Sequence, residues 1–160
     1  MAKKKMISEI LEGAAKLDSQ EARREYLKDN YSVALITILK GGFDDSVQWN
    51  LPKGEPPYKQ DDAPKGFEPN NLYKLQPRFG KYFMKGGRGD KLTSVKRESM
   101  FIEVLESLHK NEAELVLAMK DKKLTGRYKG VTLKLVQDTF PDLIKTVAAP
   151  KVKQQEAVEK

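Results

Sequence analysis

Apolar residues recur every three or four positions along most of the chain, which is the spacing of helices that bury one face. The first such segment covers residues 7–14. A second covers residues 22–27 and follows Asp18 and Ser19, whose side chains can cap a helix. We therefore predict two amphipathic helices at the start of the chain.

The run from Val33 to Leu39 is apolar and rich in β-branched residues, so its pattern fits a buried strand as well as a helix. We predict a helix, because Asn30 can cap it, Gly41 and Gly42 can end it, and no partner strand is visible elsewhere in the sequence. This choice makes the segment a third helix.

Three more helices are predicted between Glu98 and Ile144. The first carries an apolar stripe from Phe101 to Leu108, and His109 is predicted to cap its end as a cation. The second follows a cap at Asn111 and is apolar almost all round, so it should be largely buried. The third is stopped by Pro141.

The helical pattern breaks over residues 43–71, where five of the eight prolines fall. We predict a long surface loop there, whose aromatic residues pack it onto the helices. The polar and charged segment 147–160 is predicted to be a flexible tail. The sequence therefore predicts an all-α fold with one compact multi-helix domain over residues 1–146, a proline-rich surface loop and a charged C-terminal tail.

The amino-acid composition indicates which kinds of partner the protein can have. The 160 residues carry a net charge of +7 and a pI near 9.4, which favours an anionic partner such as nucleic acid or an acidic protein surface. The lack of cysteine excludes disulfides and thiolate metal sites. No apolar run approaches the roughly 20 residues that cross a bilayer. We expect a cytoplasmic protein without a membrane partner.

Basic residues form two predicted phosphate-binding clusters. The first is a hairpin between the last two helices, where the helix start at Gly130 to Thr132 would donate backbone N–H groups to a phosphate. Its cations are Lys120, Lys122, Lys123, Arg127, Lys129 and Lys134. The second cluster lies in and after a flexible glycine-rich loop, and its predicted ligands are Arg88, Lys91, Lys96 and Arg97. A plainer interpretation is that these lysines only keep the protein soluble.

Catalytic and metal-binding chemistry find little support in the sequence. His109 is the only histidine, and the chain offers no cysteine and no recognisable serine elbow to accompany it. The pairs Asp44–Asp45 and Asp61–Asp62 lie in turn-rich segments, where carboxylates more commonly accept backbone N–H groups than bind a metal. We therefore expect a protein that is not an enzyme and that needs no metal or cofactor.

Both ends of this helical framework resemble the N-terminal DNA-binding domain of phage-type ATP-dependent DNA ligases. The opening match runs from Ile7 to Asn30. The closing match joins Met119–Leu124 and Gly126 to Phe140–Ile144, where the family has a tryptophan-proline-glycine-leucine-isoleucine-like end. This chain has phenylalanine in place of the tryptophan and aspartate in place of the glycine, and its middle, residues 43–89, does not match.

The resemblance implies an all-α module that lies across the minor groove of duplex DNA and contacts the backbone without reading bases. The K-x-D-G nucleotidylation motif of a ligase does not occur in the chain, so ligation activity is not expected. Residues 49–64 and 120–144 also resemble proteins of unknown function from large T-even-like tailed phages. Double-stranded or nicked DNA is thus the expected partner, in the host-cell cytoplasm if the chain is phage-encoded.

A second hypothesis is a protein–protein interaction module. A loop as long as Trp49 to Tyr73 is uncommon in a small domain unless it has a function. In this hypothesis Trp49, Tyr58 and Phe67 dock on an acidic phage or host protein, and the lysines steer the association. A third hypothesis, a virion-associated component, is compatible with the same residues.

Overall fold

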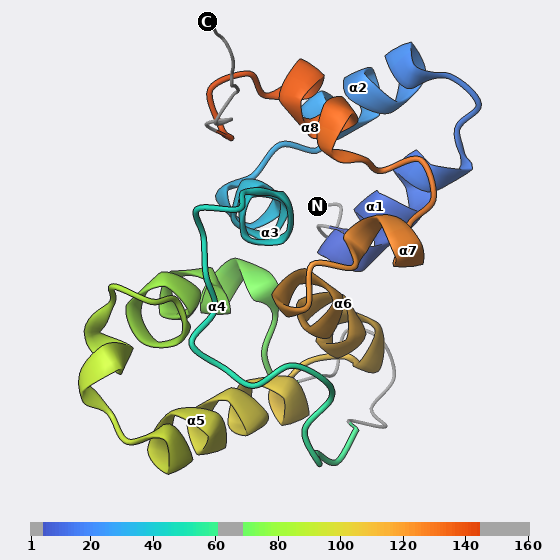
Figure 1. The fold of residues 1–160 in the computed structure, drawn as a ribbon. Helices are drawn as coiled ribbons and strands as arrows, with labels where there is room; N and C mark the ends of the chain where they lie inside the picture. The colour runs from blue at the N-terminus through green and yellow to red at the C-terminus, as the bar shows by residue number, and fades with distance from the viewer. Residues whose placement is uncertain (1–4, 61–68, 145–160) are drawn as a thin grey trace, which may run out of the picture.

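The computed structural model describes residues 5–60 and 69–144, and most of these residues are helical (Figure 1). The elements, in chain order, are α1 (Ile7–Lys16), α2 (Gln20–Asp29), α3 (Val33–Phe43), α4 (Leu72–Arg78), the π-helix η1 (Phe79–Phe83), the 3-10 helix η2 (Arg88–Lys91), α5 (Ser94–Ser107), α6 (Lys110–Lys120), α7 (Leu124–Arg127) and α8 (Leu133–Thr139). The described residues form no β-strand; an isolated antiparallel bridge joins Trp49 to Met84, and His109 is a further single bridge residue. The predicted all-α fold is confirmed.

Helix α3 confirms the choice of helix over strand, but its ends differ from the prediction. Ser32 rather than Asn30 is the cap, since its Oγ accepts a hydrogen bond of 3.0 Å from the N–H of Leu35. Gly41 and Gly42 lie inside the helix instead of ending it. They are needed there for space, because a Cβ on Gly41 would approach the Trp49 indole to 2.6 Å.

The start of α6 also differs from the prediction. His109, not Asn111, is the cap, and its Nδ1 accepts a hydrogen bond of 3.1 Å from the backbone N–H of Asn111. The Nδ1 atom of His109 therefore acts as an acceptor at the start of α6, instead of in the predicted role of a cation that caps the end of the preceding helix. The physical reason is that α6 begins at Lys110, so His109 faces the positive end of that helix.

Helices α3 and α6 pack against each other at the centre of the molecule. In Figure 1, α2 and α8 lie at the top of the molecule and α5 lies at the bottom, while α1 lies to the right of α3 and α4 lies to the left of α6. Helix α6 is buried almost all round, as predicted, with Ala113, Leu115 and Val116 fully inaccessible to solvent. Within the described ranges, no helix combines the length and the apolar character that a bilayer crossing requires.

A buried carboxylate joins α6 to the start of α1. Glu112 is only 2% exposed, and its two oxygens accept hydrogen bonds of 3.1 Å from the N–H of Ile7 and 2.8 Å from the N–H of Ser8. It thereby satisfies two donors at the N-terminus of α1. Burial raises the pKa of Glu112 above its ordinary value, although hydrogen bonds from Ser8 and Ile7 partly oppose that effect.

This raised pKa gives stability a predictable pH dependence. A carboxyl group with a higher pKa in the folded state favours folding most when it is protonated, and that contribution is lost as the pH rises through the folded-state pKa. We expect the unfolding free energy of wild type, relative to Glu112→Gln, to fall as the pH increases above about 4.5. Urea denaturation of both proteins between pH 4 and pH 8 measures this difference, and a constant difference would contradict it.

Candidate nucleic-acid interface

The predicted basic hairpin lies between α6 and α8 and includes the four-residue helix α7. Lys120 of this hairpin is buried at 6% exposure. Its ammonium donates hydrogen bonds to the carbonyls of Pro52 (2.7 Å) and Gly54 (3.0 Å) and pairs with Asp121 at 2.7 Å. Because an ammonium has three donors, this one is fully engaged. The structure gives Lys120 the role of holding the 52–54 segment, rather than the predicted contact with phosphate.

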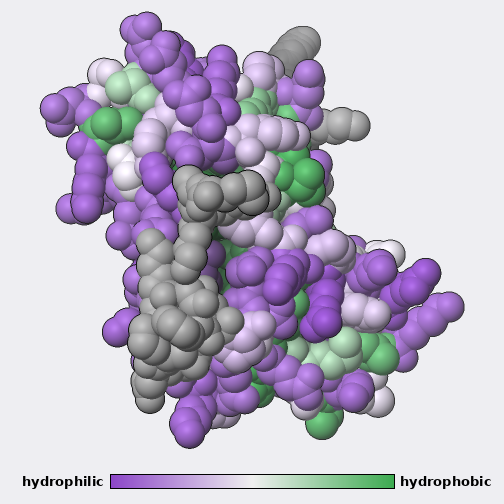
Figure 2. All heavy atoms as spheres, turned by 180° about the vertical axis from the view of Figure 1, so that it is seen from behind, coloured by the Kyte–Doolittle hydropathy of each residue, from purple (hydrophilic) through white to green (hydrophobic). Residues whose placement is uncertain are grey.

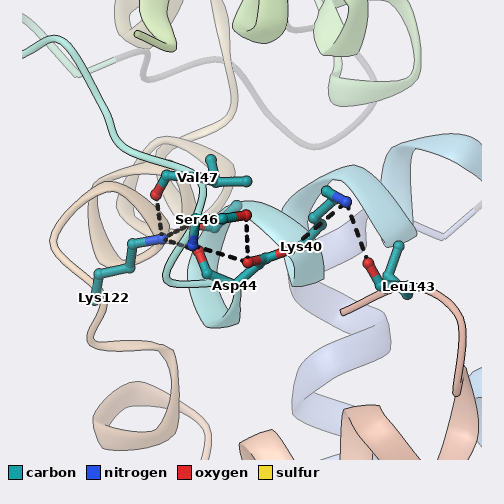
Figure 3. Close-up of polar contacts among 7 residues, drawn as sticks. Lys40, Asp44, Ser46, Val47, Lys122 and Leu143 are labelled. Carbon is teal, nitrogen blue, oxygen red and sulfur yellow. Dashed lines mark hydrogen bonds and ion pairs between the residues drawn. The ribbon is translucent and has the colours of Figure 1, made fainter. Parts of the chain in front are cut away.

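Lys122 is engaged in a similar way at the end of α3 (Figure 3). Its Nζ donates to three carbonyls, those of Gly41 (2.6 Å), Asp44 (3.0 Å) and Val47 (2.9 Å). These contacts cap the negative end of α3 with a cation. Burial lowers the pKa of Lys122, against the opposing charges of the nearby aspartates. The predicted role of Lys122 in phosphate binding is therefore replaced by a structural one.

Asp44, on the other side of the same turn, also has its side-chain contacts within the protein. One oxygen accepts hydrogen bonds from the N–H (2.9 Å) and hydroxyl (2.7 Å) of Ser46, and the other lies 3.6 Å from Lys40 (Figure 3). Burial by itself raises the pKa of Asp44, but the Ser46 hydrogen bonds and the Lys40 charge outweigh it and leave the pKa lowered. In the described part of the chain, no group of three acidic or histidine side chains is placed to hold a metal ion.

Substituting Lys122 tests this structural assignment. We expect Lys122→Met to lower the free energy of unfolding by about 2 kcal/mol, because three carbonyl groups at and just after the end of α3 each lose a hydrogen bond. Lys123→Met is the matched control, since its side chain is exposed and has no hydrogen-bond or ion-pair partner among the described residues. Equal stability of the two variants in urea denaturation would contradict the assignment.

Two further predicted ligands in the hairpin region are ion-paired. Arg127 contacts Glu114 at 2.7 Å, and its guanidinium lies 5.7 Å from the ring centre of Tyr128. Burial raises the pKa of Tyr128 to about 12, so the phenol stays neutral. Lys134 pairs with Asp138 at 3.4 Å, although its side chain remains 79% exposed. Both cations are thus partly neutralised within the protein.

A shallow pocket of about 460 Å³ lies beside α7. Its lining includes three carboxylates, from Glu55, Glu114 and Asp121, together with the cations Lys123 and Arg127. Carboxylates at this density repel a phosphate group. Of the six predicted hairpin cations, Lys123 and Lys129 are exposed without a hydrogen-bond or ion-pair partner in the described ranges.

The predicted phosphate seat at the start of α8 is short and already capped. Helix α8 has seven residues, and the hydroxyl of Thr132 accepts a hydrogen bond of 3.1 Å from the N–H of Leu135. Gly130 has a φ of +89°, and a Cβ there would lie 2.6 Å from the guanidinium carbon of Arg23. Gly130 and Thr132 therefore belong to a tight turn that packs against α2. They do not form the predicted site at which free backbone N–H groups would bind a phosphate.

A second group of cations makes no internal hydrogen bonds or ion pairs within the described ranges. The segment 78–96, which we call the basic lobe, comprises the end of α4, η1, η2 and the start of α5. Its cations are all exposed, and in the described ranges their side chains have no hydrogen-bond or ion-pair partner; they are Arg78, Lys81, Lys85, Arg88, Lys91 and Lys96. Asp90 is the only acidic residue in this segment. Among the predicted sites, the basic lobe thus has the largest excess of exposed cations over carboxylates.

Arg97 holds the basic lobe from within. It is 9% exposed, and its guanidinium donates to the carbonyls of Gly89 (2.9 Å), Leu92 (3.0 Å) and Asn50 (2.7 Å). These bonds tie η2 and the start of α5 to the segment after α3. Arg97 therefore positions the lobe, and the structure does not leave its guanidinium free for the predicted contact with phosphate.

The single acidic residue of the lobe completes the same arrangement. Asp90 accepts hydrogen bonds of 2.7 Å from the N–H of Gly86 and 2.9 Å from the side-chain amide of Asn50. The Asn50 N–H in turn donates to the carbonyl of Phe83 at 2.7 Å. The Asp90 carboxylate is thus held by donors of the lobe itself and of the 44–60 segment, which reduces its competition with an incoming phosphate.

The glycine-rich loop of the lobe is packed, not flexible as predicted. A Cβ on Gly89 would overlap the carbonyl of Tyr82, and one on Gly87 would overlap the carbonyl of Gly80. The backbone of η2 therefore lies directly on that of η1, at a distance that only glycine permits. This packing fixes the positions of Arg88 and Lys91 at their Cα atoms.

The two predicted clusters do not form one surface. In Figure 1, η2 lies at the lower left, whereas α7 and α8 lie at the right and top of the molecule. Figure 2 views the molecule from behind and shows a largely hydrophilic face on which apolar residues form small separate groups. The surface seen there offers no extended apolar patch of the kind that marks a protein-docking face.

The aromatic residues of the alternative protein-binding site are turned inward where they are described. Trp49 is 9% exposed, and its indole N–H donates to the carbonyl of Gly41 at 3.0 Å. Tyr58 is half-buried and packs against the core. Phe67 and the 147–160 tail lie outside the described residues. Trp49 and Tyr58 therefore fasten the 44–60 segment to the helices, and little of their surface is available to a partner.

Sequence reasoning missed two residues of this region, Asn50 and Glu98. Asn50 joins Arg97 to Asp90, and Glu98 lies at the edge of the lobe on α5. Helix α5 begins at Ser94, so Glu98 lies beyond its first turn. No sequence signal distinguishes Asn50, because its contacts join segments 40 and 47 residues apart.

Comparison with known proteins identifies a family but no activity. Residues 10–126 match the model of a family of unknown function (DUF6433). This range begins within α1, ends within α7, and contains α2 to α6 and the whole basic lobe. No curated protein matches the chain.

Proposed function

The chain belongs to this family of unknown function, and from the charges on its surface we propose that it is a non-catalytic module that binds the backbone of double-stranded DNA. The basic lobe supplies the cations, and no base-specific contact is required. The proposed partner is the predicted one. Of the two predicted clusters, the proposed site is the second, which lies in the basic lobe.

The observation that carries the proposal is the contrast between the two basic clusters. The lobe presents six exposed cations without hydrogen-bond or ion-pair partners in the described ranges. In the hairpin, by contrast, the ammonium groups of Lys120 and Lys122 donate hydrogen bonds to backbone carbonyl groups. Unpaired cations that are already fixed at their Cα atoms bind phosphates without first breaking an internal ion pair. They also release counterions from DNA, which is the main source of sequence-independent affinity.

Two features from the sequence support the same proposal. The net charge of +7 favours a polyanion, and the resemblance to ligase DNA-binding domains implies duplex DNA as the partner. The phage setting and the host-cell cytoplasm belong to the proposal on the same basis. The interaction and virion hypotheses gain no support from Trp49, which is buried.

A salt series tests the proposal. Fluorescence-anisotropy titrations of a labelled DNA duplex should show the affinity falling by about a thousandfold between 50 and 200 mM salt, as expected for about six phosphate contacts. Scrambling the duplex sequence should leave the affinity unchanged, because no base is read. A flat salt dependence, or no binding at low salt, would contradict the proposed function.

A further inference from the structure

A half-buried carboxylate without a partner marks a groove beside the basic lobe. Glu98, on α5, forms no hydrogen bond or ion pair with any residue in the described part of the chain. It lies between two adjoining depressions of about 300 and 260 Å³, whose linings share Leu51, Pro52 and Glu98. A carboxylate left free at the wall of a groove is an acceptor that a ligand can satisfy.

The two depressions combine apolar walls with cationic rims. Leu51, Pro52 and Phe101 supply apolar surface. Lys85 lines one depression and Lys53 lines the other. Neither lysine has a hydrogen-bond or ion-pair partner for its ammonium among the described residues. Apolar walls can contact a flat ring, the Glu98 carboxylate can accept a hydrogen bond from an amino group on that ring, and the lysines can contact an attached anion.

We propose that this groove binds a single unstacked nucleotide whose base carries an exocyclic amino group. Glu98 accepts a hydrogen bond from that amino group, and Lys85, which also belongs to the basic lobe, contacts the phosphate. The inference rests on the proposed DNA-binding function and adds to it a site for a nucleotide that has left the duplex stack, as at an end, a nick or a gap. The small volume of each depression matches one nucleotide better than a larger cofactor.

Titrations of the full chain with mononucleotides, followed by ¹H–¹⁵N NMR, test this site. Trp49 is the only tryptophan and lines one depression, so its indole N–H provides a single reporter signal. We expect 5′-dCMP to shift the Trp49 and Leu51 signals saturably and 5′-dTMP, which lacks the amino group, to bind roughly five- to a hundredfold more weakly. Equal responses to the two nucleotides, or a response to inorganic phosphate that matches dCMP, would overturn the proposal.

Variants of Glu98 separate a specific hydrogen bond to the base from a general electrostatic effect on anion binding. Removal of its negative charge should, by electrostatics alone, strengthen the binding of any anion. The proposal predicts the opposite for dCMP: Glu98→Met should abolish its preference over dTMP, whereas Glu98→Gln, which keeps an acceptor oxygen, should retain part of it. If dCMP binds to both variants as tightly as to wild type, the proposed site is wrong. Duplex binding should persist in both variants, so failure of the groove is distinguishable from failure of the DNA-binding proposal.

Discussion

Reversal of three lobe charges, in Arg88→Glu/Lys91→Glu/Lys96→Glu, should weaken duplex DNA binding by at least about a hundredfold at 100 mM salt. Each substitution removes a cation that has no hydrogen-bond or ion-pair partner in the described ranges and places a carboxylate where a phosphate would lie. The slope of log affinity against log salt should fall from about −5 to about −3, because three of about six phosphate contacts are lost. Anisotropy titrations at several salt concentrations measure both quantities.

The matched control carries the same change of charge at the hairpin, in Lys123→Glu/Lys129→Glu/Lys134→Glu. These side chains are exposed, and the first two are unpaired within the described part of the chain, so the variant should fold. Its slope should stay close to that of wild type, and its affinity should fall only through the weaker long-range field. If the hairpin variant loses the salt dependence and the lobe variant keeps it, the site belongs to the hairpin after all.

Gly89→Ala should lower the unfolding free energy by about 2–3 kcal/mol, although it adds a single methyl group. The new Cβ would overlap the carbonyl of Tyr82, and a backbone group cannot move aside as the tip of a side chain can. The displacement of η2 should also break the hydrogen bond from Arg97 to the Gly89 carbonyl, which is 2.9 Å long. Urea denaturation measures the loss of stability.

Gly80→Ala is the control for this substitution, since it lies in the same lobe and a Cβ there meets no atom within 4 Å. It should be neutral or stabilising by about 0.5 kcal/mol, because alanine restricts the unfolded chain. DNA binding should fall in Gly89→Ala and not in Gly80→Ala, although neither changes the charge. Binding of wild-type strength by Gly89→Ala would show that the geometry of the lobe is unimportant and that only its net charge matters.

The helices could be predicted because apolar periodicity depends on residues a few positions apart. Each of the six predicted helices is present, and Ser19 caps α2 as predicted. The ends of α3 were not predictable from local signals. Glycines often end a helix, but Gly41 and Gly42 lie within α3 and leave space for the side chains of Trp49 and Leu124. Leu124 lies more than 80 positions further along the chain, so no local pattern could indicate this contact.

The candidate site was predictable as a set of cations but not as a surface. Lys120 and Lys122 look like Lys123 in the sequence, since all three belong to one basic run. Only the packed fold shows that the first two donate to carbonyl groups between 66 and 81 positions away, whereas the third faces solvent. The same holds for Arg97, which looks like one more surface cation of its cluster.

The sequence by itself thus determined the all-α class, the approximate place of most helices and the positive charge, because these depend on neighbouring residues or on totals. The tertiary structure decided which cations are free. Lys122 contacts Val47 across 75 positions and Arg97 contacts Asn50 across 47, and no local pattern encodes such pairs. A lysine or arginine becomes structural when folding brings unsatisfied carbonyl groups to it, and it stays available to a phosphate when folding does not.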